Sequence, residues 1–368
     1  MTFSFPTTIL FGAGVIAQLP QTLERKHARK PMLVSDHGLL STPVFTRVHS
    51  LIPHAATFTN VNPNPTEQNV LDGVDFYRAH NCDSIVALGG GSPIDTAKAI
   101  RLKVTHTLPL AEYDDLLNGA GLITADLPPF IAIPTTAGTG SEVGRSSVIT
   151  IAATNRKTVI FSPYLIAEPA IVDPELTLGM PPHITAGTGM DALTHNVEAY
   201  LAKGYHPICD SIALGGAKLA SDNLPIVMRD PANIDARASM LMASMMGAIA
   251  FQKGLGATHS LAHPLSSEYA MHHGTANAVL LPYVLEFNQD VSNDRLASLA
   301  NHLNVADLPA HIRHLNQLGN INPALRAYNI PESALPSLAA KAIEDGCHQL
   351  NPRPCSEQDL LSLYREAW

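Results

Sequence analysis

The chain has 368 residues, which is long for one hydrophobic core and favours two domains. Its formal net charge is −9 with no basic run, so the charge pattern excludes proteins that bind nucleic acid or anionic membranes through a positive surface. The four cysteines form no CxxC pair, which argues against a thiolate zinc site and a disulfide framework and predicts a reducing, cytoplasmic compartment.

The N-terminal segment is mildly apolar, but it has no Lys or Arg before Arg25 and no clear cleavage site. We therefore expect mature protein rather than a signal peptide. No run approaches the roughly 18–20 uninterrupted apolar residues that a membrane-spanning helix needs. The sequence thus predicts a soluble protein with no membrane partner.

Short β-rich runs alternate with helical patterns through the first half of the chain, and Gly, Pro, Asn or Asp bounds each run. Such alternation predicts βαβ units around a mostly parallel sheet. The candidate strands are residues 7–11, 31–35, 56–59, 84–88, 129–133 and 168–172.

Beyond Pro181 and Pro182 the strand pattern fades, and segments rich in Ala, Leu and Met with helical spacing continue to the C-terminus. We therefore predict an α/β domain over residues 1–180 and an all-helical domain over residues 181–368. The Met-rich stretch 238–251 could form a promiscuous binding surface, but its pattern favours a buried core helix.

A glycine-rich loop, GGGS, lies between the strand SIVAL and a helix that we expect to begin near Pro93. Three glycines let the backbone approach a ligand closely, Ser92 is a good N-cap residue, and Pro93 suits the first helical position. Exposed amides at that helix start would form a phosphate site. A simple strand-to-helix turn is the alternative, although such a turn rarely needs three consecutive glycines.

Two other loops compete for a nucleotide. GAGVIA at residues 12–17 follows a strand, with Asp36 closing the next strand at the spacing of a dinucleotide-binding fingerprint, but this pattern is weak alone and we favour GGGS. PTTAGTGSEV at residues 134–143 places small hydroxyls on a loop after a strand, where they suit ribose, phosphate or carboxamide. An ordinary turn would have the same composition.

Histidines and one aspartate gather in two apolar segments of the second half. Asp191 and His195 are spaced i, i+4 on a predicted helix, and so are His259 and His263; the pair His272–His273 follows. A single histidine is more often a hydrogen-bonded core or surface residue, but two such pairs favour a divalent metal site. With imidazole and carboxylate and no thiolate, Fe(II), Zn(II) and Mn(II) all suit the donors.

Taken together, GGGSPIDTAKAI, PTTAGTGSEV, TGMDALTHNVEAY, the HSLAHPL…HHGTANAVLLPYVLEFN segment and the tail CHQLNPRP resemble the iron-containing (group III) alcohol dehydrogenases in order and spacing, over roughly residues 5–365. The resemblance implies a Rossmann-like N-terminal domain, an all-helical C-terminal domain, a cleft between them, and a homodimer. It implies His263 beside the metal in a supporting or proton-relay role. The metal ligands it implies are Asp191, His195, His259 and His273, and the coenzyme contacts are Asp36, Gly90, Gly91, Ser92, Asp95, Thr135, Thr136, Thr139 and Lys157.

The function implied is a metal-dependent NAD(P) alcohol dehydrogenase or aldehyde reductase acting on small primary alcohols or ω-hydroxy acids, with Fe(II) as the metal. Asp36 favours NAD over NADP, because a carboxylate there would repel a 2′-phosphate. Two alternatives stay open: a zinc polyol enzyme like glycerol dehydrogenase, against which the DALTH motif speaks, and a non-catalytic nucleotide-binding protein with a structural metal.

Two departures concern the substrate pocket. Where relatives carry a Gly-rich stretch, this chain has SSEYAMHHG, so Ser266, Ser267 and Glu268 would reshape the pocket, and His272 has no implied role. FQKGLG, which includes Phe251 and Lys253, looks most like the 4-hydroxybutyrate dehydrogenase branch of the family. Lys253 would then pair with a substrate carboxylate, or it is a solvated surface lysine.

Overall fold

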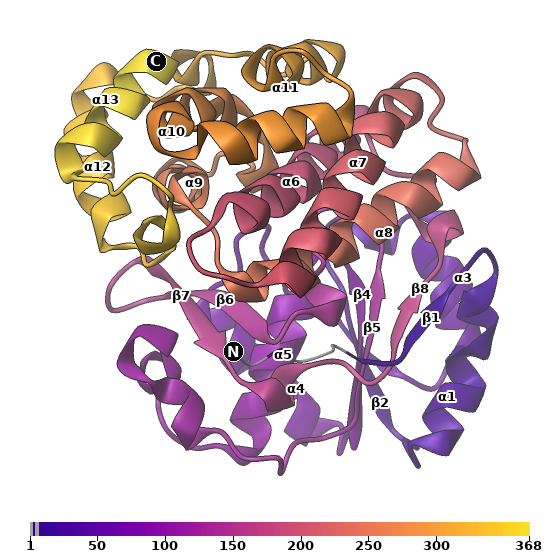
Figure 1. Ribbon diagram of the computed structural model, residues 1–368. Coiled ribbons are helices and arrows are strands. Elements are labelled where there is room, and N and C mark those ends of the chain that lie inside the picture. Colours follow the sequence, from indigo (N-terminus) through magenta and orange to yellow (C-terminus); the bar gives the residue numbers. More distant parts are fainter. Residues whose placement is uncertain (1–2, 4–6) are drawn as a thin grey trace. The chain divides into compact units, whose positions relative to one another are not determined.

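The computed structural model describes residue 3 and residues 7–368, which form two compact units (Figure 1). One unit contains residues 7–136 together with Gly140–Met180, and the other contains Pro181–Trp368 together with Ala137–Thr139 and Phe3. The expectation of a mature N-terminus falls partly on residues 1, 2 and 4–6, outside the described residues. Each unit is considered separately below.

The α/β unit is built on a six-stranded sheet in the order β1-β8-β5-β4-β2-β3, in which every pairing is parallel. All six predicted strands are present, with ends that shift by one or two residues. Because β2, β4 and β5 are buried on both faces, they consist of apolar runs without polar alternation. The strands are β1 (Ile9–Phe11), β2 (Pro31–Val34), β3 (Ala56–Phe58), β4 (Ser84–Gly89), β5 (Phe130–Pro134) and β8 (Ala170–Val172).

Helices cover both faces of this sheet (Figure 1). Met32 and Ile85 point into a core shared with α4 and α5, while their neighbours Leu33 and Val86 point into a core shared with α1 and α3. This alternation follows from the period of two along a strand. The helices of the unit are α1 (Leu19–Arg25), α2 (His37–Leu40), α3 (Pro43–Leu51), α4 (Glu67–Ala79) and α5 (Gly91–Thr105).

An antiparallel hairpin, β6 (Ser146–Ile151) and β7 (Arg156–Phe161), was not predicted. Its turn contains Asn155 in the left-handed region, at φ 49°. Two runs rich in Val, Ile and Thr on either side of a polar turn were the available signal.

The second unit is helical, as predicted, and contains no strand among its described residues. Helix α6 lies at its centre: every residue from Thr185 to Leu201 is buried, under α7, α8 and α10. The helices are α6 (Pro182–Leu201), α7 (Pro207–Arg229), α8 (Ile234–Ala250), α9 (Ala257–Tyr269), α10 (His273–Leu303), α11 (Leu308–Leu318), α12 (Leu335–Glu344) and α13 (Glu357–Ala367).

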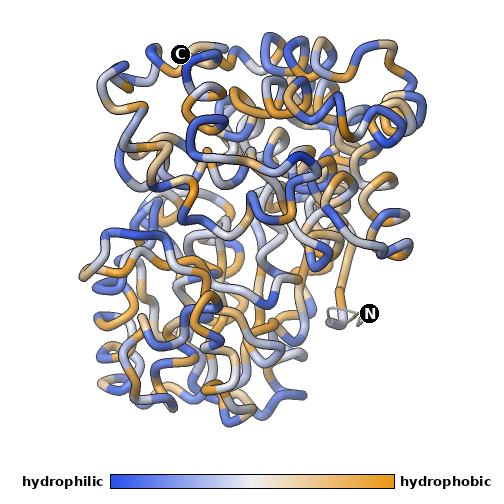
Figure 2. The backbone as a smooth tube through the Cα atoms, turned by 60° about the vertical axis from the view of Figure 1, so that its left-hand side comes forward, coloured by the Kyte–Doolittle hydropathy of each residue, from blue (hydrophilic) through white to orange (hydrophobic). Residues whose placement is uncertain are grey.

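One segment of the described chain, Ile234–Lys253, is long and apolar enough to cross a membrane by length and composition, with a mean hydropathy of 1.2. It is α8 and its extension, and core helices of globular proteins pass the same test. More than half of the segment is buried, and α8 packs on α6 and α7. Coloured by hydropathy, the tube shows apolar and polar residues alternating along the helices (Figure 2). The prediction of a buried core helix is confirmed.

Asn196 of α6 holds three helices together. Its Nδ2 donates to the carbonyl oxygens of Ala192 in α6 (2.7 Å) and Ala243 in α8 (2.9 Å). On the α7 side, a Cβ placed on Gly216 would lie 2.0 Å from Asn196 Oδ1, whereas one placed on Gly215 would meet only the flexible end of Met246. The approach of α7 to α6 therefore requires glycine at position 216 and not at position 215.

We predict that Gly216→Ala lowers stability relative to Gly215→Ala by about 1–3 kcal/mol, the usual cost of overpacking. Both changes bring the same gain in helix propensity, so the difference isolates the clash with Asn196. Urea and thermal unfolding of the two variants measure it. Equal midpoints would contradict the packing described for α6 and α7.

Candidate metal and coenzyme site

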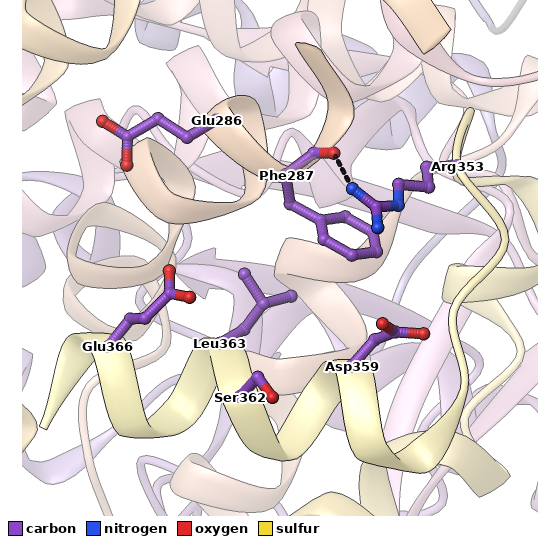
Figure 3. A pocket seen from close by; sticks show the side chains of 7 residues that line it. All are labelled: Glu286, Phe287, Arg353, Asp359, Ser362, Leu363 and Glu366. Carbon is purple, nitrogen blue, oxygen red and sulfur yellow. Dashed lines mark hydrogen bonds between the residues drawn. The ribbon is translucent and has the colours of Figure 1, made fainter. Parts of the chain in front are cut away.

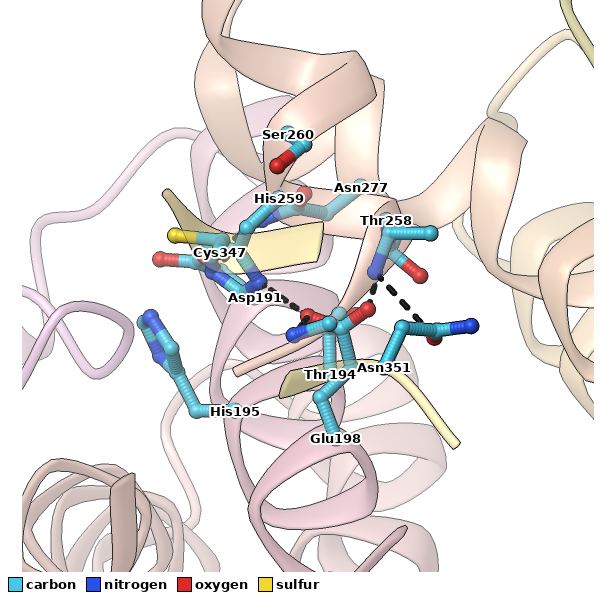
Figure 4. Close-up of polar contacts among 12 residues, drawn as sticks. Asp191, Thr194, His195, Glu198, Thr258, His259, Ser260, Asn277, Cys347 and Asn351 are labelled. Carbon is cyan, nitrogen blue, oxygen red and sulfur yellow. Dashed lines mark hydrogen bonds and ion pairs between the residues drawn. The ribbon is translucent and has the colours of Figure 1, made fainter. Parts of the chain in front are cut away.

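Two helices of the second unit bring their spaced side chains together. Asp191 and His195 project from α6 and His259 from α9, and one ligand atom from each lies within 4.8 Å of the other two. All three side chains are buried, and Figure 4 shows them together with their neighbours. The rings of His195 and His259 stack with centroids 4.7 Å apart. The two i, i+4 pairs predicted from sequence thus supply three members of one cluster.

His273, the first residue of α10, completes the set of four. Its Nε2 lies 3.6 Å from Asp191 Oδ1, and its ring centroid lies 5.4 Å from that of His259. One turn later, Asn277 Nδ2 donates to Asp191 Oδ1 (2.8 Å) and lies 3.3 and 3.2 Å from Nε2 of His259 and His273. Asn277 Nδ2 therefore lies within hydrogen-bond distance of one potential ligand atom from each of Asp191, His259 and His273.

The outer nitrogen of each buried histidine is held by a group that can only accept a hydrogen bond. His259 Nδ1 donates to Glu198 Oε2 (2.6 Å), and His195 Nδ1 donates to the carbonyl of Gly138 (3.3 Å). Both rings are therefore protonated at Nδ1 and keep the Nε2 lone pair for a metal. Two imidazoles oriented in this way, a third histidine and a carboxylate form a donor set that fits Fe(II), Zn(II) or Mn(II).

Burial and neighbouring charges shift the pKa values of His195 and His259 in opposite directions. Burial lowers the pKa of His195 to about 4, although the charge of Asp191 opposes the shift. Burial also acts to lower the pKa of His259, but the hydrogen bond and charge of Glu198 outweigh it, so this pKa is raised. His195 is thus neutral near pH 7, the form that ligates a metal.

His263 lies one turn beyond His259 on α9, and its Nδ1 donates to Asp345 Oδ2 at 2.7 Å. Asp345 follows α12 and also accepts from Ser260 Oγ (2.7 Å) and from the amide of Cys347 (2.9 Å). Burial opposes ionisation of Asp345, yet the charge and hydrogen bond of His263 hold its pKa well below the usual range. The His263 ring stacks on His273 at 5.3 Å, so a polarised imidazole lies beside the cluster.

His263, Asp345 and Cys347 also place ligand atoms within 4.8 Å of one another. Burial, followed by the charge of Asp345, raises the pKa of the Cys347 thiol well above its usual value. Asp345 already accepts hydrogen bonds from His263, from Ser260 and from the amide of Cys347, so this group forms a hydrogen-bond network centred on Asp345.

Three supporting residues were missed by sequence reasoning. Glu198 continues the i, i+4, i+7 spacing of Asp191 and His195, and Asn277 is i+4 from His273, so helical periodicity could have found both. Asp345 is 82 residues from His263 and no local pattern marks it. His272 gains a role: its Nδ1 accepts from the amide of Thr275 and caps α10 just before His273.

In the α/β unit, most predicted coenzyme residues follow the carboxyl ends of the adjacent strands β2, β4 and β5, whereas Asp95 lies within α5 and Lys157 within β7 of the hairpin. Asp36 follows β2, and the GGGS loop joins β4 to α5. The chain leaves β2 toward β3 and leaves β4 toward β5 on the opposite side, so the sheet reverses its winding between them. Ligands of such sheets bind at this switch point. GAGVIA follows β1 at the sheet edge, which supports the choice of GGGS.

The expected capping of α5 is wrong. The helix begins at Gly91, so Pro93 is its third residue, and among the described residues no side chain caps it at Gly90. Ser92 Oγ donates instead to the carbonyl of Pro63 (2.6 Å). The Ser92 side chain therefore does not cap the first-turn amides of α5.

Asp95 connects α5 to the hairpin. Its Oδ1 accepts from Ser141 Oγ (2.5 Å) and its Oδ2 from the amide of Val148 (3.0 Å). Burial raises the pKa of Asp95, while the charges of Lys98 and, more weakly, Lys157 oppose the shift. Asp95 thus fixes the loop that follows β5 to the start of the hairpin.

The loop after β5 is divided between the units and is not a loose turn. Thr135 and Thr136 belong to the α/β unit, where Thr136 Oγ1 lies 3.1 Å from a Cβ placed on Gly90; Thr139 belongs to the helical unit. Lys98, buried on α5, donates to Ser141 O (2.7 Å) and Gly144 O (3.0 Å) and fixes the loop's second part.

The proposed substrate cation is already engaged. Lys253 Nζ donates to Asp210 Oδ1 (2.5 Å) and to the carbonyl of Tyr200 (2.9 Å), and only 2% of its side chain is exposed. The expectation of a solvated lysine is therefore wrong, and the ammonium that was expected to bind a substrate carboxylate is paired with Asp210. Phe251, by contrast, lies beside the cluster, with its ring 5.2 Å from that of His195.

A separate hollow lies between α10 and α13 (Figure 3). Arg353 donates to the carbonyl of Phe287 (3.1 Å) and its guanidinium lies over the Phe287 ring. The hollow shares no residue with the histidine cluster, and we assign it no part in the chemistry. Its lining residues are Glu286, Phe287, Arg353, Asp359, Ser362, Leu363 and Glu366.

Comparison with known proteins gives matches over nearly the whole chain. A model of the family "iron-containing alcohol dehydrogenase" matches residues 6–174, and its C-terminal family matches residues 185–368. The chain is 39% identical to 4-hydroxybutyrate dehydrogenase of Cupriavidus necator (98% of each chain covered) and 36% identical to 1,3-propanediol dehydrogenase of Citrobacter freundii (99% and 97%). Among solved structures, 1,3-propanediol oxidoreductase superposes with a TM-score of 0.94 at 36% identity (100% of each chain covered). Sulfoacetaldehyde reductase from Bifidobacterium kashiwanohense, in complex with NAD+, superposes with a TM-score of 0.90 at 30% identity. The match covers 100% of this chain and 98% of that one.

We predict that His195→Ala weakens metal binding by more than the roughly 10–100-fold that residues supporting a ligand contribute. The change removes one donor and leaves the Glu198–His259 bond intact. Metal analysis after dialysis, and titration of the metal-free protein with Zn(II), measure the loss. The control is His311→Ala, which removes a histidine of α11 bonded to Ser221 (2.8 Å) and leaves the cluster unchanged. Undiminished metal content in His195→Ala would refute the site.

Proposed function

We propose that this chain, which belongs to the iron-containing alcohol dehydrogenase family, binds one divalent metal through Asp191, His195, His259 and His273, with Fe(II) as the first candidate. The supporting observation is the convergence of these donors in one buried cluster, with two rings held at Nδ1. Zn(II) and Mn(II) suit the same donors. Metal analysis of protein purified without oxygen, followed by activity of the reconstituted forms, tests the choice of metal.

The chain is an NAD(P)-dependent alcohol dehydrogenase that also reduces aldehydes. Its relatives at 33–39% identity, which match nearly its full length, are named as alcohol dehydrogenases or as an aldehyde reductase. When bound, the metal supplies a Lewis acid for the substrate oxygen and the nicotinamide supplies the hydride acceptor. The interpretation as a non-catalytic nucleotide-binding protein is set aside.

We propose His263 as the proton-transfer residue. Asp345 holds its Nδ1, so Nε2 is the nitrogen that can take the hydroxyl proton during alcohol oxidation and return it during aldehyde reduction. A charged partner at Nδ1 stabilises the imidazolium formed in that step. The side chain is 16% exposed, which gives the proton a way to solvent.

We propose coenzyme binding at the switch point of the α/β sheet, with preference for NAD. The amides of the first turn of α5, at Gly91 and Ser92, suit the pyrophosphate, and Asp36 suits the ribose hydroxyls. Asp36 also accepts from the amide of Leu39 (3.1 Å), which fixes its carboxylate at the start of α2. The remaining contacts in this proposal are Gly90, Asp95, Thr135, Thr136, Thr139 and Lys157.

We propose small primary alcohols as substrates, with ω-hydroxy acids foremost. The support is the 39% identity to a 4-hydroxybutyrate dehydrogenase and the position of Phe251, which gives the cluster an apolar neighbour suited to methylene groups. Because Lys253 is paired with Asp210, recognition of a carboxylate has to come from other residues. A zinc polyol dehydrogenase remains the alternative, and glycerol belongs in the substrate panel for that reason.

We also propose a homodimer in the cytoplasm. The family resemblance supports the dimer, and light scattering of the eluted protein measures it. The compartment is supported by the four cysteines, all of which are described and none of which forms a disulfide bond.

Asp36→Asn is expected to raise the NADP/NAD ratio of kcat/KM by about tenfold or more, since about 1.4 kcal/mol of relieved repulsion corresponds to that factor. Asparagine keeps the cap on Leu39, so α2 should be unaffected, and only the charge changes. Steady-state kinetics with both coenzymes measures the ratio. A parent enzyme that uses NADP as well as NAD would show that Asp36 does not contact the ribose.

For the substrate, we expect the parent to favour 4-hydroxybutyrate over 1-butanol and glycerol in kcat/KM, followed by the absorbance of reduced nicotinamide. Lys253→Met should change kcat/KM for 4-hydroxybutyrate and for 1-butanol in parallel, because its effect is structural. The ratio of these two values should stay within about twofold of the parent's. Losing hydrogen bonds to a charged group should cost about 1.5–3 kcal/mol of stability. Selective loss of 4-hydroxybutyrate in Lys253→Met would restore this lysine as a substrate contact.

A further inference from the structure

Glu198 adds a third functional group to the buried face of α6, one turn beyond His195. Its carboxylate is buried and receives three hydrogen bonds from the start of α9 (Figure 4). Oε2 accepts from His259 Nδ1 (2.6 Å) and from the amide of Gly256 (3.0 Å), while Oε1 accepts from the amide of Thr258 (2.7 Å). Every contact is therefore from a donor to Glu198.

Only a carboxylate satisfies this arrangement. Two backbone amides can only donate, so both oxygens have to be acceptors, and the ring nitrogen facing Oε2 has to carry a proton. An amide side chain would turn its NH2 group toward at least one of these donors. The Nε2 lone pair of His259 consequently faces Asp191 and His195 and not Glu198.

The same carboxylate also fixes where α9 begins. Gly256 is the N-cap residue of α9, and Asn351 Oδ1 accepts from the next amide, Ala257 (3.3 Å). A Cβ placed on Gly256 would lie 2.8 Å from Glu198 Oε1, so a larger residue would push the helix start away from α6. His259, two residues after Ala257, is thereby held at a set distance from the ligands of α6.

We propose that Glu198 is a positioning residue of the metal site: it selects the tautomer of His259 and ties the first turn of α9 to α6, and so sets metal affinity. The proposal rests on the metal site given under the proposed function. Outer carboxylates bonded to ligating imidazoles typically contribute about 10–100-fold to affinity.

Titration of metal-free protein with Zn(II) alone tests this role. Glu198→Ala removes the carboxylate, and we expect the dissociation constant to rise about 10–100-fold. Glu198→Gln keeps one acceptor for His259, so its Zn(II) dissociation constant should lie between those of the parent and of Glu198→Ala. Partial rescue by the amide separates tautomer control from bulk packing.

The matched control is Asn351→Ala, which removes another cap from the same helix without contacting His259. It should lower thermal stability, while its Zn(II) affinity falls less than that of Glu198→Ala, because the bond between Glu198 and His259 Nδ1 stays in place. Nitrogen-15 histidine spectra of the zinc-loaded parent add a measurement that needs no variant to fold. The Nδ1 proton of His259 in the parent should be strongly deshielded, as expected beside a carboxylate.

Parental Zn(II) affinity in Glu198→Ala, or an Nδ1 proton of His259 that is not deshielded in the zinc-loaded parent, would overturn the proposal. Failure of the metal site itself looks different: the parent would bind no Zn(II) at this cluster, and His195→Ala would change nothing. A parent that binds Zn(II) through His195 but ignores Glu198 would retain the proposed function and lose only this inference.

Discussion

Helix α6 carries ionisable groups through the centre of an apolar bundle, and the rest of the helical unit is arranged around that constraint. Asp191, His195 and Glu198 are each at most 5% exposed. Buried polar groups are tolerated only when their hydrogen-bonding capacity is met. Helix α9 supplies donors to Glu198, α10 supplies Asn277 to Asp191, and the Gly138 carbonyl serves His195. The chemistry of the site and the packing of the unit thus depend on the same few hydrogen bonds.

Much of this could be predicted from sequence because the signals were periodic. The six parallel strands are runs of apolar residues ended by turn residues, and the ligand pairs are spaced by one helical turn. The hairpin β6–β7 was missed, although its β-branched runs carried the signal. What sequence could not provide was long-range pairing: Asp345 meets His263, and Asp210 neutralises Lys253, across 82 and 43 residues. Local patterns contain no information about such distances.

Ser92 shows a different limit. Serine before proline is typical of a helix start, and the local preference was sound. Yet α5 begins earlier, at Gly91, and the hydroxyl is drawn to Pro63 in a neighbouring loop. Tertiary contacts override a capping preference of about 1 kcal/mol with ease. The same reasoning applies to Lys98. Its side chain is buried among loop carbonyls, and helix propensity carries no information about such a contact.

The four candidate ligands differ in how firmly the fold holds them. Asp191 and His195 lie in the middle of α6, whereas His259 is the third residue of α9 and His273 the first of α10. Helix ends fray far more readily than buried helix centres. The first turn of α9, however, is buried and bonded to Glu198, whereas the His273 side chain is 24% exposed at the start of α10, so a cation would exchange by transient opening of that one helix end. Three of the four candidate ligands would then stay in place on buried helical turns while only His273 moves, and the residence time of the cation would depend on the first turn of α10.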